Sequence, residues 1–291
     1  MNNKKNIVVL GFNGQLAWEL QQIANVQTIH NFVFLGRDKV DMLNPTTFHQ
    51  IKQYNPTYII NATAYTAVDL AENNQEEAYT INCTSVGKLS LLSKQLNAVF
   101  IHISTDYVFN GESEIAYIET DITAPINYYG LSKRDGENLA LQNNPKTVVI
   151  RTSWLYSSWG KNFVKTMINL MKTKPSLQVV NDQIGSPTYC GDLAMAIIKI
   201  INQFENGNEH VGIYHFQNNG KISWYQFAQE ISKNIGASIP INPVSSSEFK
   251  TPAKRPNFSL LNTQKIQLDY NIIINDWKAS LKMCIEKINQ I

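Results

Sequence analysis

Residues 6–20 read NIVVLGFNGQLAWEL, an apolar run that passes through two glycines into an amphipathic stretch. Gly11 can take the backbone angles of a tight turn, Gly14 lets the backbone approach a pyrophosphate, and Ala17 is small enough for a helix to sit near a sheet. The pattern lies between a predicted strand and a predicted helix, whose free N–H groups attract phosphates. It therefore favours a dinucleotide-binding turn, with a glycine turn that binds no ligand as the alternative.

Outward from this turn, short apolar runs alternate with longer amphipathic ones. The predicted strands are Ile7–Leu10, Phe32–Leu35, Tyr58–Asn61, Val99–Ser104, Val148–Arg151, Leu177–Val180 and Ile213–Phe216. The predicted helices are Gln15–Ala24, Pro45–Tyr54, Gln75–Leu96, Tyr128–Gln142, Lys161–Met171 and Cys190–Phe204. Continuous apolar runs are typical of strands buried on both faces. The alternation predicts an α/β fold with a Rossmann-type doubly wound parallel sheet.

The pattern changes after about residue 217, where strand signals weaken. A helix pattern ends at Gly236, a stretch with Pro and Ser covers Ile239–Pro256, and a last helix is predicted over Asn275–Ile288. We predict an NAD(P)-binding domain over residues 1–154, with return segments around 177–217, and a smaller substrate-binding lobe over 155–176 and 218–291. A lobe of this kind commonly closes a ligand cleft.

The composition excludes several classes of protein. The 291 residues are 43% hydrophobic, which suits one large domain or a large domain with a smaller lobe. A net charge of +2 with scattered basic residues gives no reason to expect nucleic acid or a membrane as a partner. No run approaches the roughly 18 apolar residues of a membrane span, and Ile7–Leu10 is too short for a signal peptide. The distant cysteines Cys83, Cys190 and Cys284 predict free thiols in a reducing cytoplasm.

The ends of the second and third strands carry candidate cofactor contacts. Arg37 follows the second strand, where a guanidinium suits a ribose 2′-phosphate, so NADPH is favoured over NADH. A solvated surface arginine is the alternative. Asp41 and Met42 are candidates for the adenine pocket, and Ala64, Tyr65 and Thr66 fall at the carboxyl end of the third strand, where ligands bind in open α/β sheets.

The fourth strand and the helix after it carry candidate catalytic groups. Thr105 ends the strand, next to Ser104, and the helix begins with Tyr129 and Lys133. A Tyr-x-x-x-Lys pair is expected by chance about once in this composition, so placement decides. At i and i+4 both side chains share one helix face and project into the cleft. A nearby ammonium lowers the pKa of a phenol, which makes Tyr129 a candidate general acid, with Thr105 holding the carbonyl oxygen.

Seven segments in register carry a family resemblance over nearly the whole chain. They are GFNGQLAWEL at 11–20, NATAYTAVDLAE at 61–72, STDYVF at 104–109, YYGLSK at 128–133, RTSWLY at 151–156, NDQIGSPT at 181–188 and TPAKRPNFSLLN at 251–262. Together they resemble the dTDP-4-dehydrorhamnose reductases, which are extended short-chain dehydrogenase/reductases. The resemblance implies that NADPH or NADH delivers a hydride to C4 of dTDP-4-dehydro-β-L-rhamnose, the last step of dTDP-L-rhamnose synthesis.

The resemblance also implies roles for single residues. The family's catalytic set maps onto Thr105, Tyr129 and Lys133, and Lys133 would also hold the nicotinamide ribose. Its cofactor contacts map onto Gly14, Gln15 and Leu16, Asp41–Met42 and Ala64–Thr66. Its substrate contacts map onto Thr105 with Asp106, and onto Trp154, with a core tryptophan as the alternative for the last. Arg255 suits the diphosphate, since a guanidinium binds phosphate oxygens in fork geometry; a surface arginine is the alternative.

One position departs from the family. Some members hold Mg²⁺ at a dimer interface between a Glu of the first helix and a Glu after the Pro-Thr segment. Glu19 matches the first, but Gly191 stands at the second, with Asp192 alongside. Losing a carboxylate argues against a hard-cation site, so we predict no metal, with Glu19 and Asp192 as the only candidates. Without the metal link, either a monomer or a homodimer fits.

Two other functions stay open at this stage. One is a reductase or epimerase of another nucleotide-deoxysugar, because Trp154 and Arg255 do not identify the sugar. The other is a non-catalytic NADP-binding regulatory subunit, against which the intact Thr105, Tyr129 and Lys133 set argues. Turnover of dTDP-4-dehydrorhamnose separates the three.

Overall fold

The larger part of the molecule is built around a six-stranded parallel sheet. The structure is a computed structural model, which describes residues 4–27 and 29–290. Residues 1–3 and 28 of the predicted NAD(P)-binding domain, and residue 291 of the predicted lobe, lie outside the described residues. In the order of the sheet, the strands are β10 (Gly212–His215), β5 (Thr147–Thr152), β4 (Val99–Thr105), β3 (Tyr58–Asn61), β1 (Asn6–Leu10) and β2 (Asn31–Leu35). The predicted doubly wound parallel sheet is confirmed.

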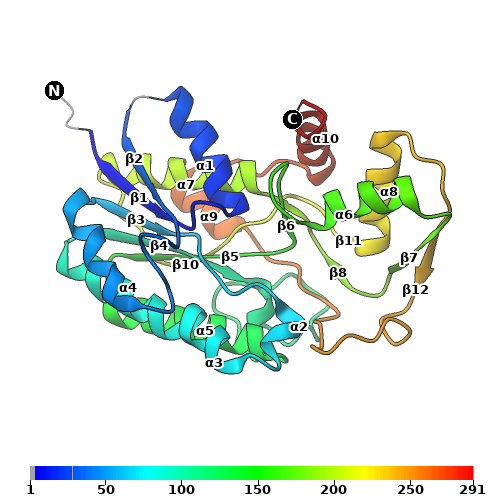
Figure 1. Ribbon diagram of the computed structural model, residues 1–291, viewed down its shortest axis with the longest axis horizontal. Helices are drawn as coiled ribbons and strands as arrows, with labels where there is room; N and C mark the ends of the chain where they lie inside the picture. The colour runs from blue at the N-terminus through cyan, green and yellow to red at the C-terminus, as the bar shows by residue number, and fades with distance from the viewer. Residues whose placement is uncertain (1–3, 28, 291) are drawn as a thin grey trace.

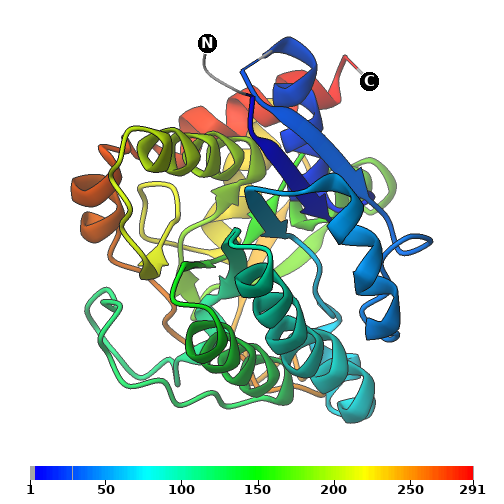
Figure 2. The ribbon, with the colours of Figure 1, turned by 90° about the vertical axis from the view of Figure 1, so that its left-hand side faces the viewer.

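Helices cover both faces of this sheet (Figures 1 and 2). Those on one face are α1 (Gln15–Val26), α7 (Cys190–Glu205) and α9 (Gln264–Tyr270). Those on the other are α3 (Gln75–Tyr79), α4 (Ser85–Gln95) and α5 (Tyr128–Asn143). The remaining helical segments around the sheet are the 3₁₀ helices η1 (Pro45–Tyr54) and η3 (Asp106–Val108), the π-helical η2 (Thr80–Thr84) and the short α2 (Val68–Ala71).

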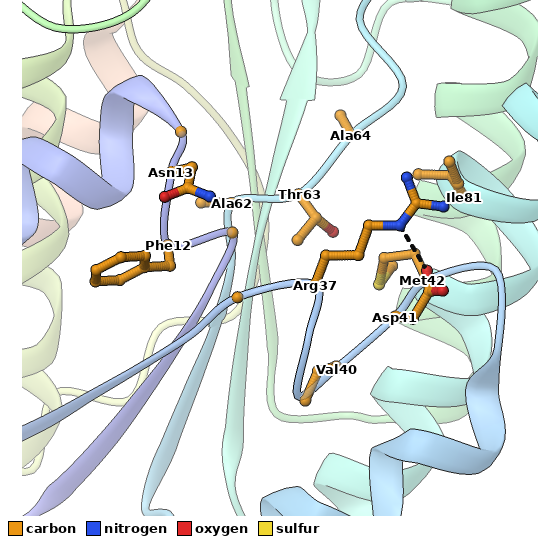
Figure 3. Close-up of a pocket in the computed structure, with 13 residues that line it drawn as sticks. Phe12, Asn13, Arg37, Val40, Asp41, Met42, Ala62, Thr63, Ala64 and Ile81 are labelled. Atoms are coloured by element: carbon orange, nitrogen blue, oxygen red, sulfur yellow. Dashed lines mark ion pairs between the residues drawn. The ribbon is translucent and has the colours of Figure 1, made fainter.

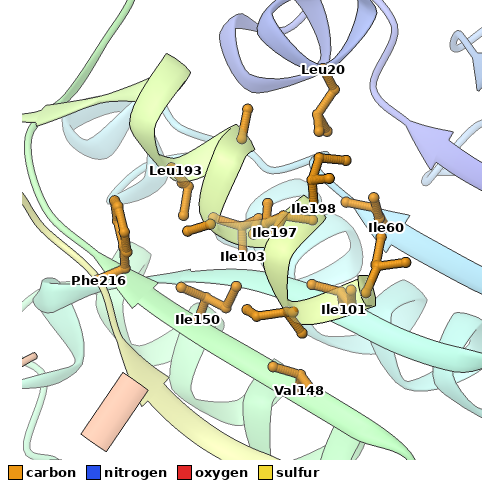
Figure 4. Close-up of a cluster of buried hydrophobic side chains, with 14 of the residues drawn as sticks. Leu20, Ile60, Ile101, Ile103, Val148, Ile150, Leu193, Ile197, Ile198 and Phe216 are labelled. Atoms are coloured by element: carbon orange, nitrogen blue, oxygen red, sulfur yellow. The ribbon is translucent and has the colours of Figure 1, made fainter. Parts of the chain in front are cut away.

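Burial on both faces explains why the strands read as continuous apolar runs. Ile7 and Val9 point to a core shared with α1 and α7, whereas Val8 and Leu10 point to a core shared with α4. Figure 4 shows Leu20 of α1 and Ile197 of α7 gathered with side chains of β3, β4 and β5 in one cluster. Full burial of one such side chain stabilises the fold by about 1.5–3 kcal/mol.

The strand order places a topological switch point between β1 and β3. The chain leaves β1 for β2 on one side and returns to β3 on the other. Leu10 and Asn61 are register partners at the carboxyl ends of these two strands. Ligands bind at this point in open α/β sheets.

A smaller lobe with its own core lies beside the sheet. Its elements are β6 (Leu155–Tyr156), α6 (Phe163–Thr173), β7 (Leu177–Val180), β8 (Ile184–Gly185), β9 (Thr188–Tyr189), β11 (Ile222–Ser223), α8 (Trp224–Ile235), β12 (Ile241–Val244) and α10 (Trp277–Ile288). Phe227, Ile231 and Leu281 are fully buried in this lobe core.

One strand pairs differently from the prediction. Leu177–Val180 forms as predicted, but it does not return to the central sheet. It pairs in parallel with β12, Leu177 opposite Ile241, at the far end of the lobe (Figure 1). The sequence does not predict this partner, because β12 contains Pro243 and a proline cannot donate a ladder hydrogen bond.

The predicted helix Gln75–Leu96 also differs, because the π-helical η2 interrupts it between α3 and α4. There the backbone of α5 approaches closely: a Cβ on Gly136 would lie 2.0 Å from the Asn82 carbonyl oxygen. The Asn82 side chain donates to the Tyr65 carbonyl at 3.1 Å and to the Ser132 hydroxyl at 3.0 Å. The π turn thus ties the β3 loop to α5, in keeping with the use of such bulges near functional sites.

Candidate active site

The glycine turn between β1 and α1 has the geometry of a phosphate cradle. Gly11 has φ +97°, and a Cβ on it would lie 3.1 Å from the Ala62 carbonyl oxygen. The Gly14 N–H donates to the Gly11 carbonyl at 2.8 Å, and Gly14 caps α1. A side chain at either glycine would fill this space, so the backbone is left open to a ligand.

A cavity of about 290 Å³ opens in front of this turn (Figure 3). It is lined by Gly11–Gly14, Gly36–Arg37, Val40–Met42, Ala62–Ala64 and Ile81. These residues come from the carboxyl ends of β1, β2 and β3, together with one turn of η2. The predicted contacts Gly11, Gly14, Arg37, Asp41 and Met42 therefore converge on one cavity.

Arg37 and Asp41 form an ion pair at the rim of this first cavity. Figure 3 shows the guanidinium reaching toward the carboxylate, and the Nε–Oδ1 distance is 3.4 Å. The Arg37 side chain is 72% exposed, so the pair is weak and the arginine can reorient. Asp41 also accepts from the Leu43 N–H at 3.0 Å, which keeps the carboxylate in place. A cationic group that can turn toward a 2′-phosphate suits NADPH better than NADH.

A second cavity, of about 330 Å³, adjoins the first. The two share Asn13, Gly14 and Ala62–Ala64, and the second is lined further by Gln15, Leu16, Thr66, Ile103, Ser104, Tyr129, Lys133, Leu155, Gly160 and Lys161. Tyr65 lines neither cavity, unlike the other predicted cofactor residues. Its backbone N–H is taken by Asn82 at 2.8 Å instead.

The start of α5 presents Tyr129 and Lys133 to this second cavity. The Asn127 side chain caps the helix by accepting from the Gly130 N–H at 2.8 Å. Lys133 is 1% exposed, donates to the Ile103 carbonyl at 2.7 Å, and lies 3.4 Å from His102 Nε2. Tyr129 stands edge-on to Tyr107, with ring centroids 5.7 Å apart. Of the two neighbouring tyrosines, only Tyr129 lines the cavity.

The prediction that Lys133 lowers the pKa of Tyr129 is wrong for this structure. Burial raises the pKa of Tyr129 to about 12, Thr105 offsets part of the rise, and the Asp106 charge adds to it. Lys133 is not among the groups that shift the pKa of Tyr129, and its Nζ donates to the Ile103 carbonyl at 2.7 Å. Burial likewise lowers the pKa of Lys133 to about 8. Tyr129 is therefore a protonated acid at neutral pH.

Thr105 and Asp106 lie together at the end of β4. The Thr105 hydroxyl donates to Asp106 Oδ1 at 3.0 Å and accepts from the Tyr107 N–H at 3.2 Å. Burial raises the pKa of Asp106 to about 6, although the neighbouring Ser259 and Thr105 side chains oppose the rise. Ser104 lines the second cavity, and its buried hydroxyl has no partner among the described residues.

A third cavity, of about 280 Å³, lies between η3 and the lobe. It is lined by Tyr107, Phe163, Met167, Gln178–Val180, Gln183, Trp224, Phe249, Thr251 and Arg255. Arg255 reaches it, but its guanidinium is held by both oxygens of Asp69, at 2.8 and 3.1 Å. Trp154 does not line it and stacks on Trp224 instead, with centroids 3.6 Å apart. The structure thus places Trp154 behind Trp224.

Glu19 and Asp192, the candidate metal ligands, are engaged in separate internal contacts. Glu19 is 2% exposed and accepts from Ser157 at 2.7 Å, and from Tyr189 and Lys287 at 3.3 Å each. Asp192 accepts from Asn218, Asn275 and Ser280. No group of three or more His, Cys, Asp or Glu side chains within residues 4–27 and 29–290 could hold a metal.

Sequence reasoning missed several side chains that line the cavities. Thr63 and Lys161 line the second cavity, and Tyr107, Gln183 and Trp224 line the third. Tyr107 follows a strand end within the STDYVF segment, which is a usable signal. Trp224 opens a helix of the lobe, and nothing in its local sequence indicates a cavity.

Known proteins resemble this chain over nearly its whole length. A family model described as the RmlD substrate binding domain matches residues 5–290. The dTDP-4-dehydrorhamnose reductase of Aggregatibacter actinomycetemcomitans is 38% identical over 284 residues, covering 95% of this chain and 97% of the relative.

Solved structures with the same name are also similar to this chain. The dTDP-4-dehydrorhamnose reductase of Bacillus anthracis, in complex with NADP, is 35% identical with a TM-score of 0.92 and covers 98% of this chain and 100% of its own. The Clostridium acetobutylicum structure of the same name is 37% identical with a TM-score of 0.92, covering 98% and 99%. The sequence resemblance is confirmed, and the chain belongs to the RmlD substrate binding domain family.

Proposed function

We propose that the protein reduces the C4 ketone of dTDP-4-dehydro-β-L-rhamnose to dTDP-L-rhamnose, with NADPH as the preferred hydride donor. One observation carries the proposal: Gln15 and Leu16 of the cofactor turn line the same cavity as Tyr129 and Lys133. A cofactor held by the turn would place its reactive end against the phenol. Relatives that carry the name of this activity, over nearly the full chain, add support.

The residues present fit a dinucleotide. Gly11 and Gly14 leave a cradle that a Cβ would fill, and the α1 N-terminus faces it. Arg37 offers a charge for a 2′-phosphate, and Asp41 and Met42 line the adenine end of the same cavity. When bound, NADPH supplies the hydride for the carbonyl carbon.

The chain's own residues supply the proton and hold the oxygen. Tyr129 is protonated at neutral pH and donates its proton to the carbonyl oxygen as charge develops on it. The Thr105 hydroxyl lies at the same strand end and donates a hydrogen bond to that oxygen, in exchange for its bond to Asp106. Lys133 orders the nicotinamide ribose and returns a proton to Tyr129.

We assign the sugar nucleotide to the third cavity. Tyr107 lines it and contacts Tyr129, so the cavity continues the reaction site toward the lobe. Arg255 would exchange Asp69 for the diphosphate, whose oxygens fit the same fork. Trp224 offers a flat apolar wall for the base or the sugar, with Trp154 supporting it from behind.

The surroundings of the enzyme are also part of the proposal. Cys83, Cys190 and Cys284 are buried free thiols, in keeping with a cytoplasmic enzyme. Within residues 4–27 and 29–290, no helix is long and apolar enough to cross a bilayer. Either a monomer or a homodimer is compatible with a site built from one chain.

The test is a reductase assay with both cofactors. Purified protein, NADPH and dTDP-4-dehydrorhamnose should lose absorbance at the reduced nicotinamide band, with dTDP-L-rhamnose as the product. NADH should support the same reaction less well. No turnover by a folded protein that binds NADPH would refute the proposed reaction. A product with a different sugar configuration would keep the reductase and change the substrate.

A further inference from the structure

A buried row of polar side chains lies beneath Lys133, and the reaction described above does not use it. His102 of β4 is fully buried, and its Nε2 lies 3.4 Å from Lys133 Nζ. Its Nδ1 lies 3.2 Å from Nδ2 of Asn61, at the end of β3. Asn61 Oδ1 accepts from the Thr63 N–H at 3.1 Å and from the Thr63 hydroxyl at 2.6 Å. The row thus joins the candidate catalytic lysine to the wall of the cofactor cavities.

The contacts of Asn61 fix the tautomer of His102. The amide oxygen must face Thr63, because the Thr63 backbone N–H can only donate. The amide NH₂ therefore faces His102, and Nδ1 of the imidazole must accept. A neutral imidazole carries a hydrogen on only one of its two nitrogens, so this hydrogen lies on Nε2. The imidazole is neutral because burial holds the pKa of His102 well below its ordinary value.

This tautomer directs an N–H at Lys133. An ammonium offers only donors, so Nε2–H and a charged Lys133 would face each other donor to donor. The neutral amine has a lone pair that accepts from Nε2–H, while one of its own N–H groups donates to the Ile103 carbonyl at 2.7 Å. The neutral Nε2–H tautomer therefore stabilises the amine of Lys133 relative to its ammonium.

The charged groups around Lys133 set how easily the ammonium gives way to this amine. Glu137 lies one turn further along α5, and its charge raises the pKa of the lysine. However, Arg151 of β5 holds both oxygens of that carboxylate, at 2.7 to 3.1 Å, and both side chains are buried. Tyr129, on the same helix, stays neutral with its pKa at about 12. The pKa of Lys133 lies at about 8, because burial outweighs Glu137.

We propose that His102 is a positioning residue that donates its Nε2–H to the amine of Lys133, and that Asn61 holds the imidazole in the tautomer that can do so. Its catalytic consequence rests on the proposed function. After Tyr129 has protonated the carbonyl oxygen, an N–H bond of the Lys133 ammonium breaks and the phenol O–H bond is restored. The amine left behind already has a hydrogen-bond donor.

Nitrogen NMR of the free protein tests the tautomer directly. In wild-type protein at neutral pH, the His102 ring should carry its proton on Nε2, as read from the ¹⁵N shifts of both ring nitrogens. Asn61→Asp keeps an acceptor for Thr63 and offers a second one to His102. The variant should move the imidazole proton to Nδ1. A wild-type proton on Nδ1, or on both nitrogens, would overturn the proposal.

The second readout is the titration of Lys133, followed through its ¹³Cε shift. Asn61→Asp should raise the titration midpoint by about one pH unit or more, since Nε2 becomes an acceptor for the ammonium. The charge of the new carboxylate also raises the pKa of Lys133 directly. To separate this effect from that of the imidazole, Asn61→Asp is also made in a His102→Met background. A smaller rise there supports the imidazole's role, and an equal rise in both backgrounds refutes it.

These readouts do not depend on turnover. If the reductase assay fails while the tautomer and the titration behave as stated, only the proposed function falls. The wild-type tautomer decides the matter even if the His102 variant does not fold. In the active enzyme, Asn61→Asp should shift the basic limb of the kcat–pH profile upward, which a merely structural defect would not do.

Discussion

The cofactor side and the lobe side of the cleft are built by different means. The first cavity is lined almost wholly by three strand ends, and its key feature is backbone left bare at Gly11 and Gly14. The third cavity draws side chains from five stretches between Tyr107 and Arg255. Backbone geometry recurs wherever a strand turns into a helix, whereas side-chain walls depend on how distant segments meet. Substitutions should therefore change binding through the backbone on the cofactor side and through single side-chain contacts on the lobe side.

The junction between the two sides should be the most sensitive point. Tyr129→Phe removes one proton and little volume, so kcat should fall by about 10²–10⁴-fold while NADPH binding, measured by fluorescence titration, survives. Tyr128→Phe is the matched control, because Tyr128 is the neighbouring phenol and lies outside the second cavity. Equal losses in the two variants would mean that the roles are wrongly assigned.

Asp106, which is buried, and Asp69, which is paired with Arg255, should respond to pH in opposite directions. Burial raises the folded pKa of Asp106 to about 6, so wild-type stability should fall relative to Asp106→Asn as pH rises from 4 to 6. The difference is at most about 3 kcal/mol. Arg255 lowers the folded pKa of Asp69, so wild-type stability should fall relative to Asp69→Asn as pH drops below about 4.

Denaturant unfolding at several pH values measures both slopes. The Asp69 effect should be the smaller one, because its side chain is 37% exposed and solvent screens the pair. Parallel slopes for the two variants would show that burial of Asp106 and the Arg255 pair of Asp69 do not shift the two pKa values in opposite directions.

The same contrast explains what could be predicted from the sequence. The strands at Tyr58–Asn61 and Leu177–Val180 were predicted to the residue, because apolar runs and their flanks are local signals. Gly11 and Gly14 are predictable from the sequence, because a glycine between a strand and a helix permits a tight turn and a close approach of the backbone to a phosphate. The pairing of β7 with β12 was missed because its partner lies over 60 residues away and contains Pro243.

The electrostatics of the site escaped prediction for a related reason. Spacing placed Lys133 on the same helix face as Tyr129, and the structure agrees. The sign of the pKa change at Tyr129 depends on burial of the phenol, which is not visible in YYGLSK. The bond between Arg255 and Asp69 likewise joins residues 186 positions apart.

Gly11→Ala should test the backbone side. The new Cβ meets the Ala62 carbonyl at 3.1 Å and the residue keeps φ +97°, which costs about 1–3 kcal/mol of folding stability and should lower NADPH affinity at least tenfold. Gly207→Ala is the control, since Gly207 has φ +84° with nothing within 4 Å of its Cβ. It should lose comparable stability and keep its NADPH affinity. A loss of affinity in both variants would mean that backbone strain, not close approach, matters.

Arg255→Lys should have the smallest effect and should be confined to the lobe side. A lysine keeps the charge but loses the fork, so KM for the sugar nucleotide should rise about tenfold, or 1.4 kcal/mol, with NADPH affinity unchanged. Arg37→Lys is its counterpart on the cofactor side and should weaken NADPH while leaving NADH and the sugar nucleotide alone. Steady-state kinetics with each substrate varied separates the two. If both variants changed both constants alike, the cleft would behave as one electrostatic surface, and the division between a backbone-built side and a side-chain-built side would not describe binding.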